Sequence, residues 1–307
     1  SVPDALYLSY NSPGQSVIRK SVSTRPADLV AYWPMDEGDG EKTVDAMGRF
    51  DGQLIGGTTW QDGYFGKGIQ FNGTNAYVST QATADVLGVD GKKPRTITFW
   101  VKVDGNNPQS QPGFYGYGEL ANPNGVNKFW GLRNIKDGGY TQLLSQHWCW
   151  DPDVWVSEGM QDKWMHLAHI YTGTNVQVYV NGTIRRDWFK DDIDTGNYFP
   201  LQFGRWTDEN NLGRTFLGLL DDFRVYNDWL SASDVQSIYG NGSGDFQVIP
   251  TLDIPSVVDG SSVLGRLNFQ RNGLPIEVVD FNVTTDLSIT NGAIDFSSLV
   301  YEGNGTY

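Results

Sequence analysis

The stretch Asn175–Trp188, with the sequence NVQVYVNGTIRRDW, decides the fold class. Valines alternate with other residues in its first half, which is the period of a β-strand with one buried face. Asn181-Gly182 follows, and Asn-Gly between two such runs is the strongest short-range signal of a β-hairpin. Similar runs recur along the chain between turns rich in Gly, Asn and Asp. Because helical periodicity is nearly absent, the sequence predicts an all-β antiparallel sandwich.

The composition changes along the chain and predicts three parts. Residues 1–26 form a strand-like N-terminal extension, residues 27–243 a large β domain, and residues 244–307 a smaller β domain with fewer aromatic residues. The linker GNGSGDF (240–246) separates the two domains. One short helix is expected just before it, in LSASDVQSIYG (230–240), with Ser231 or Ser233 as the N-cap.

Charge and hydropathy exclude several classes of partner. The 307 residues carry a formal net charge of -14, so we expect no nucleic-acid partner and no attraction to an anionic membrane surface. No apolar run approaches the roughly twenty residues of a membrane-spanning helix, so we expect no membrane insertion. Cys149 is the single cysteine, which rules out a disulfide within the chain. Ser1 fits either a removed secretory signal or a clipped initiator Met, and the sequence does not choose between them.

Five stretches follow one another in an order that is typical of one family. They are LVAYWPMDEGDGEKTVDAMGRFDGQLIGG (29–57), GYFGKGIQFNGTNAYVST (63–80), RTITFWVKVD (95–104), DKWMHLAHIYTGTNVQVYVNGTI (162–184) and FLGLLDDFRVYNDWLSASDVQSIY (216–239). Together they resemble the strands and closing helix of the laminin-G-like (LamG-type), concanavalin A-like lectin/glucanase domains. The resemblance implies a jelly roll of two antiparallel sheets packed face to face. Function is left open, because this fold hosts lectins, glycosidases, lyases and structural modules.

The resemblance also implies a structural calcium ion. Members of this family often hold Ca²⁺ between the turn after the first strand and the last strand. The matching residues are Asp36, Gly38, Asp45 and Asp221. Ca²⁺ prefers six to eight hard oxygen ligands, which carboxylates and turn carbonyls supply.

Two constellations raise the question of catalysis. Glu37-Gly38-Asp39-Gly40-Glu41 has the spacing of a glycosidase motif, but it falls at the family's Asp-Glu-Gly turn rather than on a mid-sheet strand. Tyr140, Gln146 and His147, with Arg133 upstream, are residue types that jelly-roll lyases use, without the flanking motifs of those enzymes. His166 and His169 lie three positions apart and face opposite sides of one strand, so they are expected to be structural rather than a shared metal site. We therefore expect no catalytic activity.

Aromatic residues cluster in FWGLRNIKDGGYTQLLSQHWCWDPDVW (129–155). Sugar rings stack on aromatic side chains, while neighbouring polar groups bind sugar hydroxyls. The predicted glycan-binding residues are Trp130, Arg133, Tyr140, Trp148, Trp150, Asp151, Trp155 and Trp206. Some of these aromatic residues are expected to belong to the core, and an exposed cluster also fits a protein–protein surface.

The C-terminal part resembles the beginning of a bacterial immunoglobulin-like domain in FNVTTDLSITNGAIDFSSLVYEGNGTY (281–307). Such a sandwich needs about seven strands, and the chain after residue 246 is short for that number. A strand from residues 1–26 could complete the domain within the chain or in a neighbouring chain.

The sequence therefore predicts an extracellular, cell-surface or virion-surface protein that binds a glycan or cell-surface polysaccharide in recognition or adhesion. The alternative is a structural subunit of a fibre, sheath or phage particle that self-assembles through its terminal β-strands. A polysaccharide-active glycosidase or lyase comes third.

Overall fold

The chain divides into two compact units. One unit is formed by residues 27–239, and the other by residues 1–26 together with residues 240–307. In the computed structural model, the described residues are 7–12, 15–19, 29–119, 126–136, 139, 141–147, 153–206, 214–240, 247–251, 266–271 and 274–275. In this part of the chain, no helix is long and apolar enough to cross a membrane.

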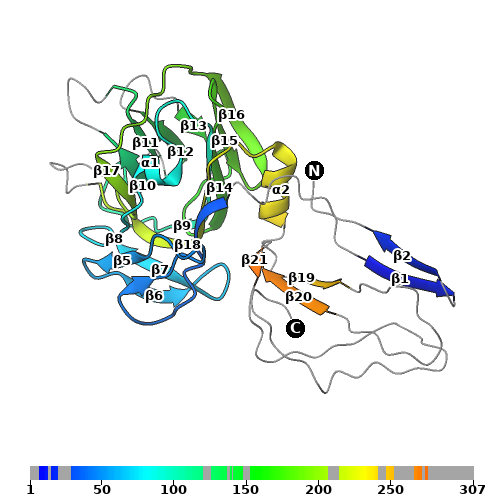
Figure 1. Cartoon of the computed structure of the whole chain (residues 1–307). Helices are drawn as coiled ribbons and strands as arrows, with labels where there is room; N and C mark the ends of the chain where they lie inside the picture. Colours follow the sequence, from blue (N-terminus) through cyan, green and yellow to red (C-terminus); the bar gives the residue numbers. More distant parts are fainter. Residues whose placement is uncertain are drawn as a thin grey trace. The chain divides into compact units, whose positions relative to one another are not determined.

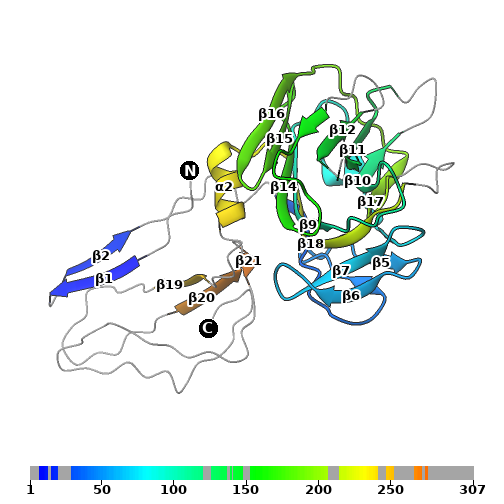
Figure 2. The same cartoon turned by 180° about the vertical axis from the view of Figure 1, so that it is seen from behind.

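The larger unit is a sandwich of two antiparallel eight-stranded sheets, as the sequence predicts. Figures 1 and 2 show the two sheets from opposite sides. The first, sheet I, has the strand order β13-β12-β11-β10-β17-β8-β5-β4. Its strands are β4 (Lys42–Thr43), β5 (Gly52–Ile55), β8 (Tyr77–Ser79), β10 (Gly113–Gly118), β11 (Phe129–Ile135), β12 (Gln142–Gln146), β13 (Asp153–Trp155) and β17 (Phe199–Phe203).

The second sheet, sheet II, has the order β16-β15-β14-β9-β18-β7-β6, and β3 also pairs with β18. Its strands are β3 (Leu29–Trp33), β6 (Thr59–Asp62), β7 (Lys67–Asn72), β9 (Arg95–Val103), β14 (Trp164–Tyr171), β15 (Asn175–Val180), β16 (Thr183–Phe189) and β18 (Leu217–Tyr226). A four-residue helix, α1 (Ala84–Leu87), follows β8.

The core lies between the two sheets and is rich in aromatic side chains. Phe99 and Phe223 of sheet II stack with their ring centroids 5.3 Å apart, and Phe203 of sheet I lies 4.3 Å from Phe223. Trp33, also from sheet II, packs edge-on against Phe203 at 4.9 Å. Because successive side chains of a strand point to opposite faces, each sheet has one face in this core and one face turned away from it.

Two local predictions are confirmed. Asn181 and Gly182 connect β15 to β16 with positive φ angles of 50° and 73°, the backbone of a two-residue hairpin turn. Helix α2 (Ala232–Gly240) follows β18. Ser231 precedes it, and the Ser231 and Asp234 side chains each accept the other's backbone N–H at 3.3 and 2.9 Å, the arrangement of a capping box. Figure 1 shows α2 beside β14, and its Val235 packs with Ala168 and Tyr179 of sheet II.

The smaller unit contains five described strands. A hairpin is formed by β1 (Tyr7–Ser12) and β2 (Gln15–Arg19), and a three-stranded antiparallel sheet by β19 (Gln247–Thr251), β20 (Arg266–Arg271) and β21 (Leu274–Pro275). The predicted immunoglobulin-like domain is not shown, because most of residues 244–307 lies outside the described part of the chain.

Candidate functional site

The outward face of sheet I carries Arg133, Trp155 and Trp206, three of the four described members of the predicted glycan-binding set. On β11, Trp130 and Leu132 point into the core, so the alternating residues Phe129 and Arg133 belong to the opposite face. Guanidinium, amide and aromatic groups lie together on this outward face.

Trp130 corrects one prediction. Its side chain is 0% exposed and stacks on the imidazole of His169 with the ring centroids 4.0 Å apart. A tryptophan in the core cannot stack on a sugar at the surface, so Trp130 is not part of a ligand platform. The physical reason is strand alternation: Trp130 and Arg133 lie three positions apart on one strand and face opposite sides.

Strand register aligns a row of small and neutral side chains across the outward face. The row crosses six strands in the order Gln146, Gly131, Gly116, Gln202, Ser79 and Gln53. The Phe129 ring lies on its two glycines, since a Cβ built on Gly116 would be 2.3 Å from Phe129 Cζ. Gln146 and Gln202 are nearly buried, whereas Ser79 is half-buried and Gln53 is exposed. The row therefore supplies a close-packed, neutral floor for the groups above it.

Trp206 is held between two arginines. The Arg214 guanidinium carbon lies 4.1 Å from the centroid of the indole, and that of Arg133 lies 4.8 Å from it. Both guanidiniums donate to the side-chain oxygen of Gln111, Arg133 Nη1 at 2.7 Å and Arg214 Nη1 at 2.8 Å. Trp206 itself is 4% exposed, so the prediction that it presents its ring to a ligand is wrong. It supports the two arginines instead.

A third arginine joins this cluster from the residue before Trp206. Arg205 stacks on the Tyr77 ring of β8 at 3.5 Å from its centroid, and its Nε donates to Gln202 Oε1 at 2.6 Å. Arg205 is half-buried, as are Arg133 and Arg214. We call Arg133, Arg205 and Arg214 the arginine cluster.

Among the described members of the predicted set, Trp155 is the exposed aromatic residue. It lies on the edge strand β13, is 57% exposed, and pairs in register with Gln142 on β12. Tyr140, Trp148, Trp150 and Asp151 lie outside the described residues.

Sequence reasoning missed Arg214, Gln111 and Tyr77, because no local pattern links them to Arg133. Only the pairing of distant strands brings them together.

The predicted calcium ligands divide into two groups. Asp36 and Asp221 approach the same turn between β6 and β7: Asp36 Oδ1 accepts the Lys67 N–H at 2.9 Å, and Asp221 Oδ2 accepts the Phe65 N–H at 2.8 Å. Asp221 is 0% exposed, and its Oδ1 has no hydrogen-bond partner among the described residues. Burial, with repulsion from Asp222 and Asp36, raises the pKa of Asp221 well above its usual value. A cation would compensate this carboxylate, so Asp36 and Asp221 fit a calcium site.

Asp45 has a different role. Its two carboxylate oxygens accept the backbone N–H groups of four residues, Tyr32, Met47, Arg49 and Phe50, at 2.8 to 3.1 Å. These bonds use the lone pairs that a metal would need, so the structure makes Asp45 an organiser of the loop after β3. Gly38 has φ 75° and lies beside the Lys67 side chain. No group of three or more His, Cys, Asp or Glu with metal-binding geometry occurs in the described residues.

All three histidines are buried. In the core, Ser145 Oγ lies 2.6 Å from His169 Nε2 and 2.8 Å from His147 Nε2, and the Tyr115 hydroxyl lies 2.6 Å from His169 Nδ1. Burial lowers the pKa of both imidazoles well below the usual 6.5, with a further contribution from the nearby Arg95 cation. The network is therefore neutral at neutral pH.

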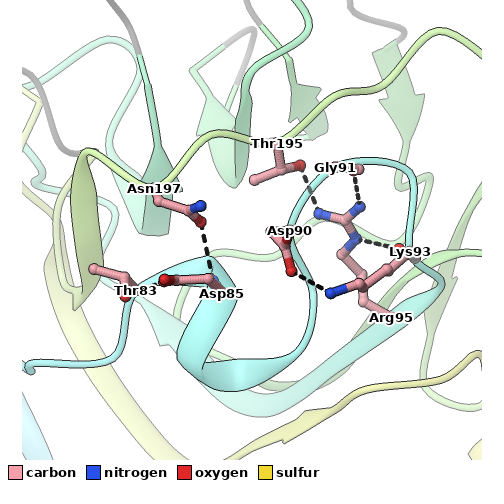
Figure 3. Close-up of polar contacts among 8 residues, drawn as sticks. All are labelled: Thr83, Asp85, Asp90, Gly91, Lys93, Arg95, Thr195 and Asn197. Carbon is pink, nitrogen blue, oxygen red and sulfur yellow. Dashed lines mark hydrogen bonds and ion pairs between the residues drawn. The ribbon is translucent and has the colours of Figure 1, made fainter.

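Within the described part of the chain, neutral groups rather than a carboxylate fix Arg95 beside this network. Figure 3 shows its guanidinium bound to the carbonyl oxygens of Gly91 and Lys93 and to the Thr195 hydroxyl, at 2.8, 3.0 and 2.5 Å. The Arg95 guanidinium carbon also lies 5.1 Å from the ring centroid of Trp130 and 5.2 Å from that of Tyr171. Burial is the main reason why His147 and His169 stay uncharged, and the Arg95 cation adds to it by repelling a second proton nearby.

His166 faces the other side of β14, as its spacing from His169 predicts. It pairs in register with Trp100, which pairs in turn with Asp221, and its ring lies against those of Trp100 and Tyr239. Neither ring nitrogen of His166 has a hydrogen-bond partner among the described residues. Burial, followed by repulsion from Arg224, lowers its pKa to about 3.

Comparisons with known proteins agree with this architecture. The model of the concanavalin A-like lectin/glucanases superfamily matches residues 72–236, more than half of the chain. A sequence comparison with curated proteins gives no match.

Several solved structures share the fold. Domain 4 of AbnA, a GH43 extracellular arabinanase from Geobacillus stearothermophilus solved with arabinotriose, is 23% identical. That alignment covers 68% of this chain and 97% of the other, with a TM-score of 0.51. The binding domain of Paraclostridial Mosquitocidal Protein 1 is 18% identical over 69% of this chain and 52% of its own, with a TM-score of 0.50. A Trypanosoma rangeli sialidase mutant is 15% identical over 72% of this chain and 34% of its own, with a TM-score of 0.54.

Proposed function

The chain belongs to the concanavalin A-like lectin/glucanases superfamily, and on this premise we propose that its jelly roll is a non-catalytic glycan-binding module of an extracellular, cell-surface or virion-surface protein. The observation that carries the proposal is the outward face of sheet I. Half-buried Arg133, Arg205 and Arg214 stand there over a neutral floor. Arginine N–H groups donate to sugar hydroxyls in fixed directions, and the exposed Trp155 ring offers a stacking surface at the sheet edge.

The positions of the acid–base residues support a binding role rather than catalysis. His147, His166 and His169 are the only histidines of the chain and are each at most 1% exposed, so none reaches a substrate on the outward face. Glu37, Asp39 and Glu41 lie on an exposed turn between β3 and β4. There they lack the scaffold that holds a nucleophile and an acid across a sugar ring.

The predicted structural calcium ion stays a proposal, with fewer ligands than the sequence predicts. Asp36 and Asp221 would hold it, and the ion would neutralise a buried carboxylate and tie β18 to the turn between β6 and β7. Asp45 is no longer among the proposed ligands. The alternative function, a fibre or sheath subunit assembled through terminal strands, stays a prediction that size-exclusion chromatography over a range of concentrations tests.

A glycan array probed with the full chain tests the binding function. We expect hits that are lost in Arg133→Ala and weakened in Trp155→Ala. Trp229→Ala is the matched control, because Trp229 is also partly exposed (39%) but lies between β18 and α2 rather than on sheet I. An array without hits, or hits that survive Arg133→Ala and Trp155→Ala unchanged, would contradict the proposal.

A further inference from the structure

Two arginines are buried in the described part of the chain, and their surroundings differ. Arg224 is 1% exposed and forms an ion pair, because its Nη2 lies 3.0 Å from Asp222 Oδ2. Arg95 is 0% exposed, and its hydrogen-bond partners among the described residues are three neutral oxygens. Burying a charge without a counter-charge is unfavourable, so the Arg95 guanidinium lacks the compensation that Arg224 has.

The described carboxylates near this end of β9 are bound to other cations. Figure 3 shows the Asp90 carboxylate bound to the Lys93 ammonium, at 2.5 Å, and not to the guanidinium of Arg95. Asp192 forms an ion pair with Lys190 at 2.9 Å, and its side chain is 60% exposed. Because water screens an exposed carboxylate, its attraction for a buried guanidinium is weak. Neither carboxylate therefore takes the place of a counter-ion beside Arg95.

A tyrosine hydroxyl without an acceptor lies in the same part of the core. Tyr117 on β10 pairs in register with Trp130 on β11, and both side chains belong to the core. The Trp130 ring centroid lies 5.1 Å from the Arg95 guanidinium carbon. Burial raises the pKa of Tyr117 to about 12, an effect that the nearby Arg95 cation opposes. The Tyr117 hydroxyl and the Trp130 indole nitrogen are both buried without a hydrogen-bond partner among the described residues. An uncompensated cation beside donors that lack acceptors is an environment that favours an anion.

We propose that the sandwich binds a monovalent halide ion, such as chloride, between the Arg95 guanidinium of sheet II and the Tyr117 hydroxyl of sheet I. A guanidinium has five N–H donors, and the three hydrogen bonds of Arg95 leave two of them for the ion. One negative charge neutralises one positive charge, whereas a divalent anion would leave a net charge in a medium of low dielectric constant. A spherical ion also accepts hydrogen bonds from any direction, which suits donors from two sheets. The site is independent of the proposed glycan-binding function.

Thermal unfolding of the full chain tests whether chloride binds the folded state. Sodium gluconate is replaced stepwise by sodium chloride at a constant ionic strength of about 200 mM, which keeps charge screening constant. All eleven tryptophans lie within residues 27–239, so tryptophan fluorescence follows the larger unit. With a Kd of about 10 mM, 100 mM chloride multiplies the folding equilibrium constant about elevenfold. We therefore expect the melting temperature to rise by about 3 to 5 °C.

Variants and a heavier halide assign the effect to this site. Arg95→Met removes the charge and should abolish the difference between chloride and gluconate. Tyr117→Phe removes only the hydroxyl and should lower the chloride affinity about tenfold. Tyr171→Phe is the matched control: its ring centroid lies 5.2 Å from the Arg95 guanidinium carbon, but its hydroxyl already donates to the Gly173 carbonyl at 2.8 Å. Its chloride response should equal that of the wild type. In crystals of the full chain soaked in sodium bromide, anomalous diffraction should place a bromide ion within about 3.5 Å of an Arg95 guanidinium nitrogen.

Several results would overturn the proposal. Identical melting curves in chloride and gluconate, or a full chloride response in Tyr117→Phe, would show that no halide binds between these two side chains. Bromide peaks at exposed side chains alone would mean an adventitious ion only. A response to sodium sulfate that equals the chloride response and depends on Arg95 would show that the site does not select monovalent ions, so the assigned class would be wrong. If Arg95→Met does not fold, Tyr117→Phe and the bromide positions decide the question without it.

Discussion

Replacing His166 tests whether this buried imidazole on the outward face of sheet II stays uncharged in the native state. His166 is 1% exposed, and burial lowers its pKa to about 3. In the unfolded chain a histidine has a pKa of about 6.5. Between pH 6.5 and 3, the unfolded state therefore binds a proton at this residue that the native state does not bind. The free energy of unfolding is therefore not reduced by His166 above pH 6.5, and it decreases as the pH falls below that value.

The magnitude follows from the proton count. One proton that differs between the two states changes the free energy of unfolding by about 1.4 kcal/mol per pH unit. From pH 6.5 to pH 5, His166 alone therefore removes about 2 kcal/mol of stability. His166→Leu keeps a similar volume, introduces no titratable group, and deletes two ring nitrogens that have no hydrogen-bond partner among the described residues.

Urea unfolding at pH 7 and pH 5, followed by tryptophan fluorescence, measures the effect. We expect His166→Leu to be within about 1 kcal/mol of wild type at pH 7 and about 2 kcal/mol more stable than wild type at pH 5. His166→Gln is the control that keeps a polar side chain without titration, so it should share the reduced pH dependence. An unchanged difference between wild type and His166→Leu at the two pH values would refute the reasoning, because His166 would then titrate equally in both states.

Three further predictions concern elements described above. If Ca²⁺ occupies the Asp36–Asp221 site, a chelator lowers the melting temperature of the wild type but not that of Asp221→Asn; equal responses would remove Asp221 from the ligand set. Gly182→Ala places a Cβ 2.9 Å from Gln236 and Tyr239 at a φ of 73°, so thermal unfolding should show a loss of about 1 kcal/mol or more. Ser231→Ala removes the N-cap of α2 and should cost about 1 kcal/mol by urea titration, whereas the exposed Ser157→Ala should leave stability unchanged.

The fold was readable from the sequence where local chemistry determines it. Asn181-Gly182 predicts its own turn because both residues tolerate positive φ. Ser231 and Asp234 predict the start of α2 because their spacing matches a capping box. In both cases the residues that carry the prediction lie within four positions of one another, so no tertiary information is needed.

The candidate site was only partly readable, for two physical reasons. Strand β11 has apolar residues at both alternating sets of positions, so its sequence does not say whether Trp130 or Phe129 faces the core. The packing of the two sheets decides, and Trp130 is inside. The second reason is distance along the chain. Arg214 and Arg133 share the Gln111 side chain and the Trp206 ring, contacts for which the sequence contains no local signal.

Asp45 shows the same limit for a metal ligand. Its position after the first strand suggests a calcium ligand by resemblance, but the chain folds back so that four N–H groups converge on the carboxylate. The identities of the side chains do not reveal how many backbone N–H groups will surround a given carboxylate in the folded chain. A carboxylate that organises a loop and one that binds a cation therefore look alike in the sequence.

Gly116 and Gly131 lie under the Phe129 ring, so the residues at these two positions influence where that ring lies on the proposed binding surface. A Cβ at Gly116 or Gly131 would lie 2.3 or 2.7 Å from the Phe129 ring, so an alanine at Gly116 must displace that ring. An alanine at Gly131 would also meet the Tyr115 carbonyl oxygen at 2.8 Å. Phe129 packs against Trp206, and Trp206 supports Arg133 and Arg214. The size of the residues at these two positions thus affects the spacing of the proposed ligand-binding groups. A substitution at Gly116 would therefore change the shape of the proposed binding surface without replacing any of the proposed ligand-binding side chains.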